Sequence, residues 1–161
     1  MIRIEDYSKM LAGEQAILIQ QTEGLSHADS LIQPQPGGNC LNWVMGHLDD
    51  GLIALLKVCG GEKPDYIPSF DRYGYGSEPV VGDGEGVLPL QDLVASYEAL
   101  TNAIIDRLAE MQEGDFDQET DIFSGKVTHG YAAFFFFFHI SFHLGQLEFG
   151  RNLAGKTEKL I

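Results

Sequence analysis

Residues 134–143 read FFFFFHISFH, so five phenylalanines directly precede two histidines, His139 and His143, that stand four residues apart. On an α-helix, side chains four residues apart lie one turn apart on the same face, so both imidazoles can reach one point. The same face carries Phe135, Phe136, Phe142 and Gln146. The stretch is therefore either the buried middle of a core helix or the wall of a metal site, and the rest of the chain decides which.

A third histidine, His47, lies on a helix expected over residues 39–59, with Asn39 as its N-cap. One stripe of that helix carries Cys40, Trp43, Val44, His47, Gly51, Ala54 and Val58. We expect His47 on the core face, where the two small residues that follow leave room for its ring. Three buried imidazoles need hydrogen-bond partners, and a divalent metal satisfies three nitrogen lone pairs at once. The alternative is a set of histidines that hydrogen-bond within the core.

Three histidine ligands would leave coordination positions free, as in catalytic zinc sites. Imidazole suits Zn, Ni, Fe or Cu. We expect Zn or Ni at His47, His139 and His143, with Fe or Mn as alternatives. The remaining histidines, His27 and His129, are expected to be solvated.

Helical periodicity continues through four segments, at residues 4–24, 39–59, 90–111 and 128–155, with Thr128 as the cap of the last. Residues 61–89 are rich in glycine and proline, which predicts a long loop, and short alternating stretches there allow a minor hairpin. The pattern predicts an all-α protein, an antiparallel four-helix bundle that forms one domain over residues 1–161.

The chain of 161 residues carries 10 Lys and Arg against 24 Asp and Glu, a formal net charge of −14. Such a surface repels nucleic-acid phosphates and anionic membranes, so neither partner is expected. The first ten residues, MIRIEDYSKM, lack the apolar segment of a signal peptide. Cys40 and Cys59 are therefore expected as reduced thiols in a cytoplasmic protein, with no role assigned beyond packing.

Two motifs resemble one family. The stretch 42–48, NWVMGHL, and the stretch 139–146, HISFHLGQ, followed by Arg151, are similar to the second-helix and fourth-helix signatures of DinB-like (DinB/YfiT superfamily) proteins. The resemblance implies a four-helix bundle that holds a divalent metal through His47, His139 and His143. It also implies an enzyme that uses a thiol such as mycothiol or bacillithiol, since studied relatives include S-transferases and an isomerase of this kind. Several members of the family are dimers. The phenylalanine run departs from the usual pattern and makes the pocket more apolar.

We therefore expect a metal-dependent thiol S-transferase, with a metal-dependent hydrolase as a competing mechanism. A non-catalytic, stress-associated dimer that binds a metal or a small ligand is the alternative. Gln146 is the candidate catalytic residue, or else a packing amide. Trp43, Arg72 and Arg151 are candidate substrate contacts. The alternatives are core packing for Trp43, a loop pinned to the bundle for Arg72, and capping of helix carbonyls for Arg151.

Two further expectations concern the helix surfaces. Glu14, on the inner stripe of the first helix, is either a general base or a buried carboxyl paired across the bundle. Phe134, Phe137 and Leu144 are expected on the face of the last helix opposite the histidines. A helix that is apolar on both faces needs a second covering, which a homodimer would supply. The alternative is that the long loop or the chain termini cover this face.

Overall fold

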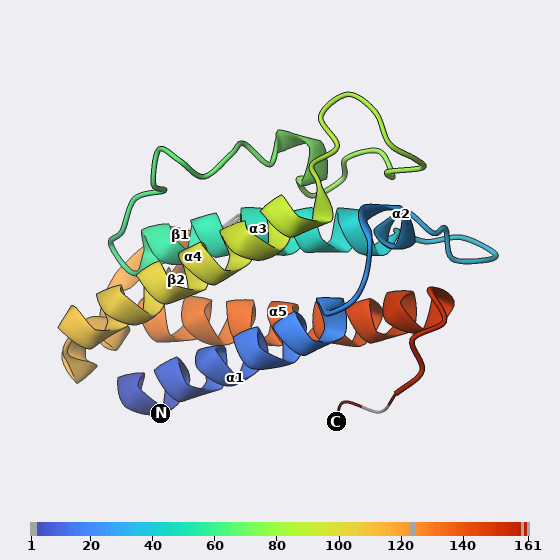
Figure 1. Ribbon diagram of the computed structural model, residues 1–161. Helices are drawn as coiled ribbons and strands as arrows, with labels where there is room; N and C mark the ends of the chain where they lie inside the picture. Colours follow the sequence, from blue (N-terminus) through green and yellow to red (C-terminus); the bar gives the residue numbers. More distant parts are fainter. Residues whose placement is uncertain (1–2, 123–124, 159, 161) are drawn as a thin grey trace.

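The computed structural model describes residues 3–122, 125–158 and 160 (Figure 1). It contains the four expected long helices: α1 (Ile4–Thr22), α3 (Leu41–Val58), α4 (Leu90–Glu110) and α5 (His129–Leu153). The expected helical fold is confirmed, and the ends of the helices fall within a few residues of the predicted ones. None of the helices in the described ranges is long and apolar enough to cross a membrane.

Thr128 caps α5 as predicted, because its Oγ1 accepts a hydrogen bond of 3.1 Å from the backbone N–H of Tyr131. The cap predicted for α3 was wrong by one residue. Cys40, not Asn39, is the N-cap residue, and its side chain makes no capping hydrogen bond. Residues 26–30 form a short helix that was not predicted, α2 (His27–Ser30), closed by a capping box between Ser26 and Asp29.

The minor hairpin that the sequence allowed in the long loop does not form, since residues 61–89, all described, contain only the 3₁₀ turn η1 (Asp71–Tyr73) as a regular element. A hairpin of β1 (Glu119–Ile122) and β2 (Gly125–Thr128) occurs instead between α4 and α5, after the 3₁₀ turn η2 (Glu113–Asp117). The two strands pair antiparallel and lead directly into α5. The hairpin therefore sets the start of the helix that carries two of the histidines.

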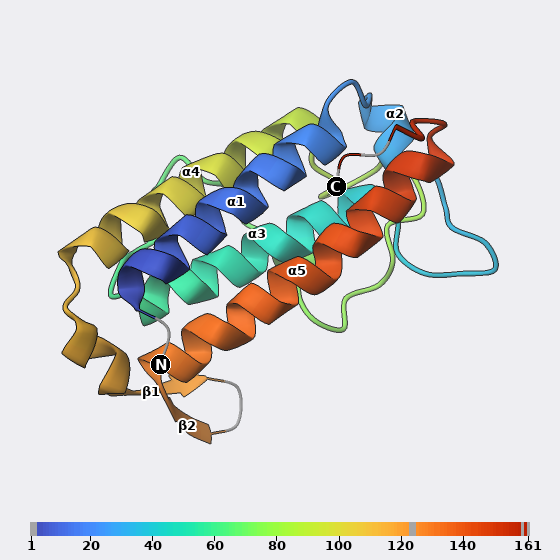
Figure 2. The same cartoon turned by 90° about the horizontal axis from the view of Figure 1, so that it is seen from below.

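The four long helices form a ring in which α1 and α3 each lie beside both α4 and α5. The start of α3 meets the start of α4, where Asn42 donates to the Leu88 carbonyl, and their ends meet where Arg107 donates to the Cys59 carbonyl. Neighbours α3 and α4 thus run in the same direction, while α5 runs opposite to both (Figure 2).

Helices α1 and α5 also run in the same direction, because Tyr7 donates to the Ala133 carbonyl near their starts and Arg151 donates to the Gln21 carbonyl near their ends. The bundle therefore contains two parallel pairs of adjacent helices, which run opposite to one another.

The parallel pair of α3 and α4 explains the long loop. Eighteen residues of α3 span about 27 Å at 1.5 Å per residue, so the chain has to travel that far back before α4 can begin. Figure 1 shows the connection, in green, running along the outside of α3. Ile67, Phe70, Tyr73 and Val80 of this loop are buried against the bundle. The loop is therefore a fixed outer layer over α3.

The phenylalanine run of α5 is divided between three environments. Phe136 is buried and Phe137 is partly buried against the core, whereas Phe134 and Phe138 are exposed. Leu144 is buried as well. The expected outer face of Phe134, Phe137 and Leu144 was therefore wrong for its last two members, which turn toward α1 because that helix packs beside α5.

Two carboxyl groups lie inside the bundle. Glu14 on α1 is buried, and Ser141 Oγ on α5 donates a hydrogen bond of 2.6 Å to its Oε1. Burial raises the pKa of Glu14 to about 8, although the Ser141 hydrogen bond acts in the opposite direction. Asp49 on α3 is fully buried, and burial raises its pKa as well. Both acids are thus favoured in the neutral form, because a buried charge without a partner is costly.

The Glu14→Gln variant should be more stable than the native chain at mildly alkaline pH. A glutamate in water has an ordinary pKa of 4.5, whereas Glu14 in the fold has a pKa of about 8. Between these values the unfolded chain has lost the proton and the folded chain keeps it, so stability falls as pH rises. Thermal unfolding should give Glu14→Gln a Tm several degrees above the native value near ~pH 8, and almost the same Tm near ~pH 5. Exposed Glu62→Gln is the matched control, and an E14Q advantage that does not change with pH would contradict the assignment.

Candidate metal centre

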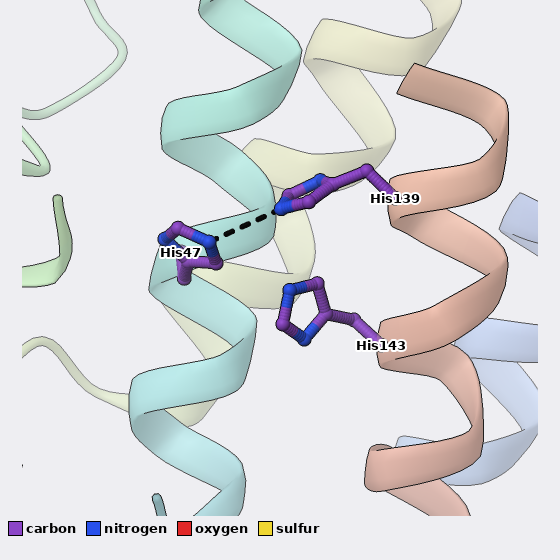
Figure 3. Close-up of side chains that lie close together, drawn as sticks. All are labelled: His47, His139 and His143. Carbon is purple, nitrogen blue, oxygen red and sulfur yellow. Dashed lines mark hydrogen bonds between the residues drawn. The ribbon is translucent and has the colours of Figure 1, made fainter. Parts of the chain in front are cut away.

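Three histidines converge between α3 and α5 (Figure 3). His47 comes from α3, and His139 and His143 come from successive turns of α5. One nitrogen from each ring lies within 4.8 Å of the other two, and the Nε2 atoms of His47 and His139 are 3.1 Å apart. The i, i+4 spacing read from the sequence thus brings its two imidazoles to one point, and the predicted third histidine joins them there.

The ring of His47 is held by the loop. Its Nδ1 lies 2.9 Å from the backbone carbonyl oxygen of Tyr73. Since a carbonyl only accepts, Nδ1 carries the proton and Nε2 keeps its lone pair. Trp43, one turn earlier, stacks on the ring at a centroid distance of 4.7 Å and an interplanar angle of 18°. The Trp43 indole N–H in turn donates to Ser77 Oγ, so this candidate substrate contact is fixed beside the histidines.

The ring of His143 is held by its own helix. Its Nδ1 lies 2.7 Å from Oε1 of Gln146, an amide oxygen that accepts the proton. Nε2 of His143 therefore also keeps its lone pair. Gln146 is one turn beyond His143, as the sequence indicated, and it contacts the His143 ring at Nδ1. Its position fits a group that orients a metal ligand.

The third ring, His139, lies among apolar atoms. Phe135 is stacked beside it at 6.3 Å, and a Cβ added to Gly51 would come within 3.3 Å of the His139 ring. Burial, followed by the neighbouring His143 and His47, lowers the pKa of His139 to about 4. Burial likewise lowers the pKa of His143. These two rings are therefore neutral near pH 7, the state in which imidazole binds a metal.

His47 does not occupy the core stripe predicted for it. The stripe that faces the core carries Val44, Met45, Leu48, Leu52, Leu55 and Leu56. His47 is only half-buried and Ala54 is exposed, so the centre lies at the edge of the bundle, between α3 and α5. The prediction was wrong because the loop also packs on α3, and α3 is therefore covered on two sides. Gly51 was expected to leave room beside His47, but the ring that lies next to it is that of His139.

Tyr73 connects the long loop to this centre, and the sequence analysis did not predict that role. Its ring is fully buried, its hydroxyl donates to Asn42 Oδ1 at 3.1 Å, and the same hydroxyl accepts from the Leu88 N–H at 2.7 Å. A Cβ on Gly46 would fall 2.3 Å from the Tyr73 ring. The Tyr73 ring therefore packs directly on Gly46, next to His47, where a side chain would occupy the same space. The signal in the sequence was the glycine itself, in the middle of a helix.

The two arginines expected to contact substrate are engaged elsewhere. Arg72 donates to the carbonyls of Glu78 and Pro79 within its own loop. Arg151 is buried and donates to the carbonyls of Gln21 and Glu23 at the end of α1. The structure thus shows the alternative roles for these residues, since Arg72 closes the loop on itself and Arg151 caps α1. Substrate contact by either arginine stays a prediction.

The remaining thiols and histidines lie outside the cluster. Both cysteines are free, as expected, and buried. Burial raises the pKa of Cys59 to about 12, which leaves it protonated and unreactive. His27 is only partly exposed and accepts a hydrogen bond from the Leu90 N–H, so its expected solvation was only partly correct. His129 is the first residue of α5 and is half-buried.

The residues present fit a divalent cation. His47 and His143 direct their Nδ1 protons at oxygen acceptors, so the Nε2 atom of each ring has the lone pair that could bind a metal. The third ring, His139, is neutral near pH 7. Three neutral imidazole donors are a known ligand set of catalytic zinc. Asp50, close to His47 on α3, is a half-buried carboxyl whose pKa is raised by burial, an effect that His47 opposes.

Comparison with known proteins agrees with the helical fold described above. A family model described as the DinB superfamily matches residues 10–147. A solved structure described as a conserved protein from Enterococcus faecalis is similar in fold, with a TM-score of 0.72 and 16% identity. The match covers 96% of this chain and 98% of that one. No curated protein matches the sequence.

The Gly46→Ala variant should lose stability and disturb the centre. The added methyl would overlap the Tyr73 ring, whose nearest atom lies 2.3 Å away and which is fully buried. Such overpacking costs roughly 1–3 kcal/mol. The matched control is Gly13→Ala on α1, where nothing lies within 4 Å of the new methyl. That change should stabilise the helix by about 0.5–1 kcal/mol. Urea unfolding of both variants measures the difference, and equal effects would contradict the role of Tyr73.

Proposed function

The chain belongs to the DinB superfamily, and on that premise we propose that it is a divalent-metal-dependent enzyme that acts on a low-molecular-weight thiol. His47, His139 and His143 would hold the ion through their Nε2 atoms. Zn or Ni is the proposed metal, with Fe or Mn as alternatives. Thiol S-transfer is the proposed reaction.

The observation that carries the proposal is the preorganisation of the donors. Tyr73 and Gln146 take the Nδ1 protons of His47 and His143, so each ring already presents a lone pair to the same space. The Nε2 atoms of His47 and His139 lie 3.1 Å apart, and without an ion these two atoms can share only one proton. Buried imidazoles need hydrogen-bond acceptors in any case, but here both acceptors hold Nδ1, which leaves the Nε2 atoms of His47 and His143 with their lone pairs.

A divalent ion held by these histidines would lower the pKa of a bound thiol or water and would thereby supply a nucleophile near neutral pH. The chain's own groups position the ligands and exclude water. Trp43 covers one side of His47, while Phe135 and Phe142 contact the rings of His139 and His143. These apolar walls favour a substrate with an apolar portion beside its thiol. A metal-dependent hydrolase would use the same walls with water as the nucleophile.

The decisive experiment combines loading and turnover. The metal-loaded protein is offered mycothiol, bacillithiol or a simpler thiol together with a panel of electrophiles, and the S-conjugate is followed by mass spectrometry. Conjugate formation that requires both metal and thiol supports the transferase. Turnover of an ester or amide without thiol identifies the hydrolase. A loaded protein inactive in both assays leaves the non-catalytic, metal-binding alternative.

Metal content should depend on the cluster histidines alone. Protein purified without an affinity tag should carry about one divalent ion per chain, and His139→Ala should carry almost none. His129→Ala, a change at the start of the same helix, should keep the native content, because His129 is outside the cluster. Elemental mass spectrometry gives the ratio. A native protein that binds none of Zn, Ni, Mn or Fe would refute the centre.

Gln146 should act on affinity through His143. Gln146→Leu removes the acceptor of the His143 Nδ1 proton and should weaken metal binding by about 10- to 100-fold. Gln146→Glu keeps an acceptor and should retain the affinity. Gln20→Leu, an exposed change on α1, is the control. Competition with a chromophoric chelator measures all three, and unchanged binding in Gln146→Leu would exclude the positioning role.

A further inference from the structure

A hollow of about 470 Å³ lies in the seam between α1 and α5, which run side by side in Figure 2. We call it the α1–α5 hollow. Its lining includes Gly13, Glu14 and Gln21 of α1 and Ser141, Gly145 and Glu148 of α5. Ser141 stands two residues from both His139 and His143, about 200° around the helix, so the hollow is on the other side of α5 from the histidines. Its volume falls in the range of about 300–1,000 Å³ that small-molecule sites occupy.

Two glycines keep the α1–α5 hollow open. A Cβ added to Gly13 or to Gly145 would meet no described atom within 4 Å, so the packing of the helices does not require either glycine. Glycine within a helix is nevertheless less stable than alanine. The effect of both glycines in the fold is to leave space beside Glu14. Contacts within the chain do not explain that space, whereas a bound molecule would.

The hollow also borders buried polar side chains that are not satisfied. Glu14 is only 5% exposed, and its Oε1 accepts the Ser141 hydrogen bond, but its Oε2 has no hydrogen-bond partner among the described residues. Gln21, two turns further along α1, is fully buried, and both atoms of its side-chain amide are unpaired within the described part of the chain. Buried polar atoms are nearly always paired. Two unsatisfied side chains on the wall of one space therefore point to a ligand.

The charges around the hollow select a cation. Two carboxyl groups, those of Glu14 and Glu148, line it, and none of the described lining residues is basic. The whole chain has a net charge of −14, which attracts cations and repels anions. Burial raises the pKa of Glu14 to about 8, and only the Ser141 hydrogen bond opposes that rise. An ammonium group beside Glu14 would supply the opposite charge that its carboxylate lacks.

The spacing of the polar groups fits a molecule with two such charges. Glu14 and Gln21 are seven residues apart on α1, a helix rise of about 10 Å. Because α1 and α5 are parallel, Glu148, seven residues after the Ser141 that binds Glu14, lies at the Gln21 end. The wall between the two ends is apolar and includes Ile17 of α1 and Leu144 of α5.

We propose that the α1–α5 hollow binds an aliphatic diamine, with one ammonium at Glu14 and the other at Gln21 and Glu148. The side-chain oxygen of Gln21 is an acceptor for the N–H groups of that second ammonium. The hydrocarbon chain lies over the two glycines, against the apolar wall. The site is separate from the histidine cluster, and it does not depend on whether the histidines hold a metal.

Isothermal titration calorimetry with hexamethylenediamine at near-neutral pH and physiological salt tests the site. One molecule should bind per chain. Hexylamine has the same apolar body but one charge, and it should bind about 10-fold or more weakly. Glu14→Gln should raise the Kd for the diamine by roughly 10- to 100-fold, because it removes a charged acceptor. The matched control is Glu62→Gln, which removes one exposed charge elsewhere and should keep the native Kd.

Gly145→Ala tests the space itself. The new methyl would fill part of the hollow without touching a described atom, so thermal unfolding should show a fold at least as stable as the native one. The Kd for the diamine should nevertheless rise several-fold. His139→Ala should keep the native Kd, because an amine that bound a metal at the histidines would lose its site in this variant.

Three results would overturn the proposal. The first is a native chain that does not bind hexamethylenediamine. The second is the same Kd in Glu14→Gln and Glu62→Gln, which would leave only a general attraction to the acidic surface. The third is hexylamine binding as tightly as the diamine, which would exclude a site for two charges.

Discussion

The position of the Tyr73 ring on Gly46 is the contact on which the rest of the site depends. It fixes the long loop to α3, and the carbonyl of the same tyrosine then holds the Nδ1 proton of His47. Tyr73 therefore has three effects: it covers the outer side of α3, it orients the His47 ring of the candidate metal centre, and it closes the loop through Asn42 and Leu88. A side chain larger than hydrogen at position 46 would separate the loop from the helix and release the ring.

The loop exists because two neighbouring helices run in the same direction. A bundle whose successive helices were all antiparallel neighbours could use short turns, but α3 and α4 are parallel and require a return path as long as the helix. The chain uses that path as a structural layer, with Phe70 and Tyr73 buried beneath it. The centre lies at the edge of the bundle, between α3 and α5, where the loop, α3 and α5 all contribute contacts to the same small group of rings. Two of its rings, His47 and His139, are 92 positions apart in the chain.

Burial has the same electrostatic effect throughout the interior. It raises the pKa of the carboxyls Glu14 and Asp49 and lowers the pKa of His139 and His143, because each charged form would lose its hydration. The interior therefore favours neutral groups, which suits imidazoles that have to offer lone pairs. The negative charge of the chain is carried by the surface, and the exposed side of α5 is almost free of it. Charged side chains are thus rare both around the histidines and on the exposed face of α5.

The sequence by itself determined the helical class, the positions of the four long helices and the three histidines of the centre. Those features depend on local spacing: a period of 3.6 residues places His139 and His143 on one face whatever surrounds them, and glycine or proline interrupts a helix wherever it occurs in number. Tertiary structure decided which neighbours each face meets. It placed Arg151 on the carbonyls of α1 and Arg72 within its own loop, turned Phe137 and Leu144 toward α1, and moved His47 from the expected core stripe to the bundle edge. Helical periodicity defines the faces of a helix, but only the packing of the other helices and the loop fixes which of those faces is covered.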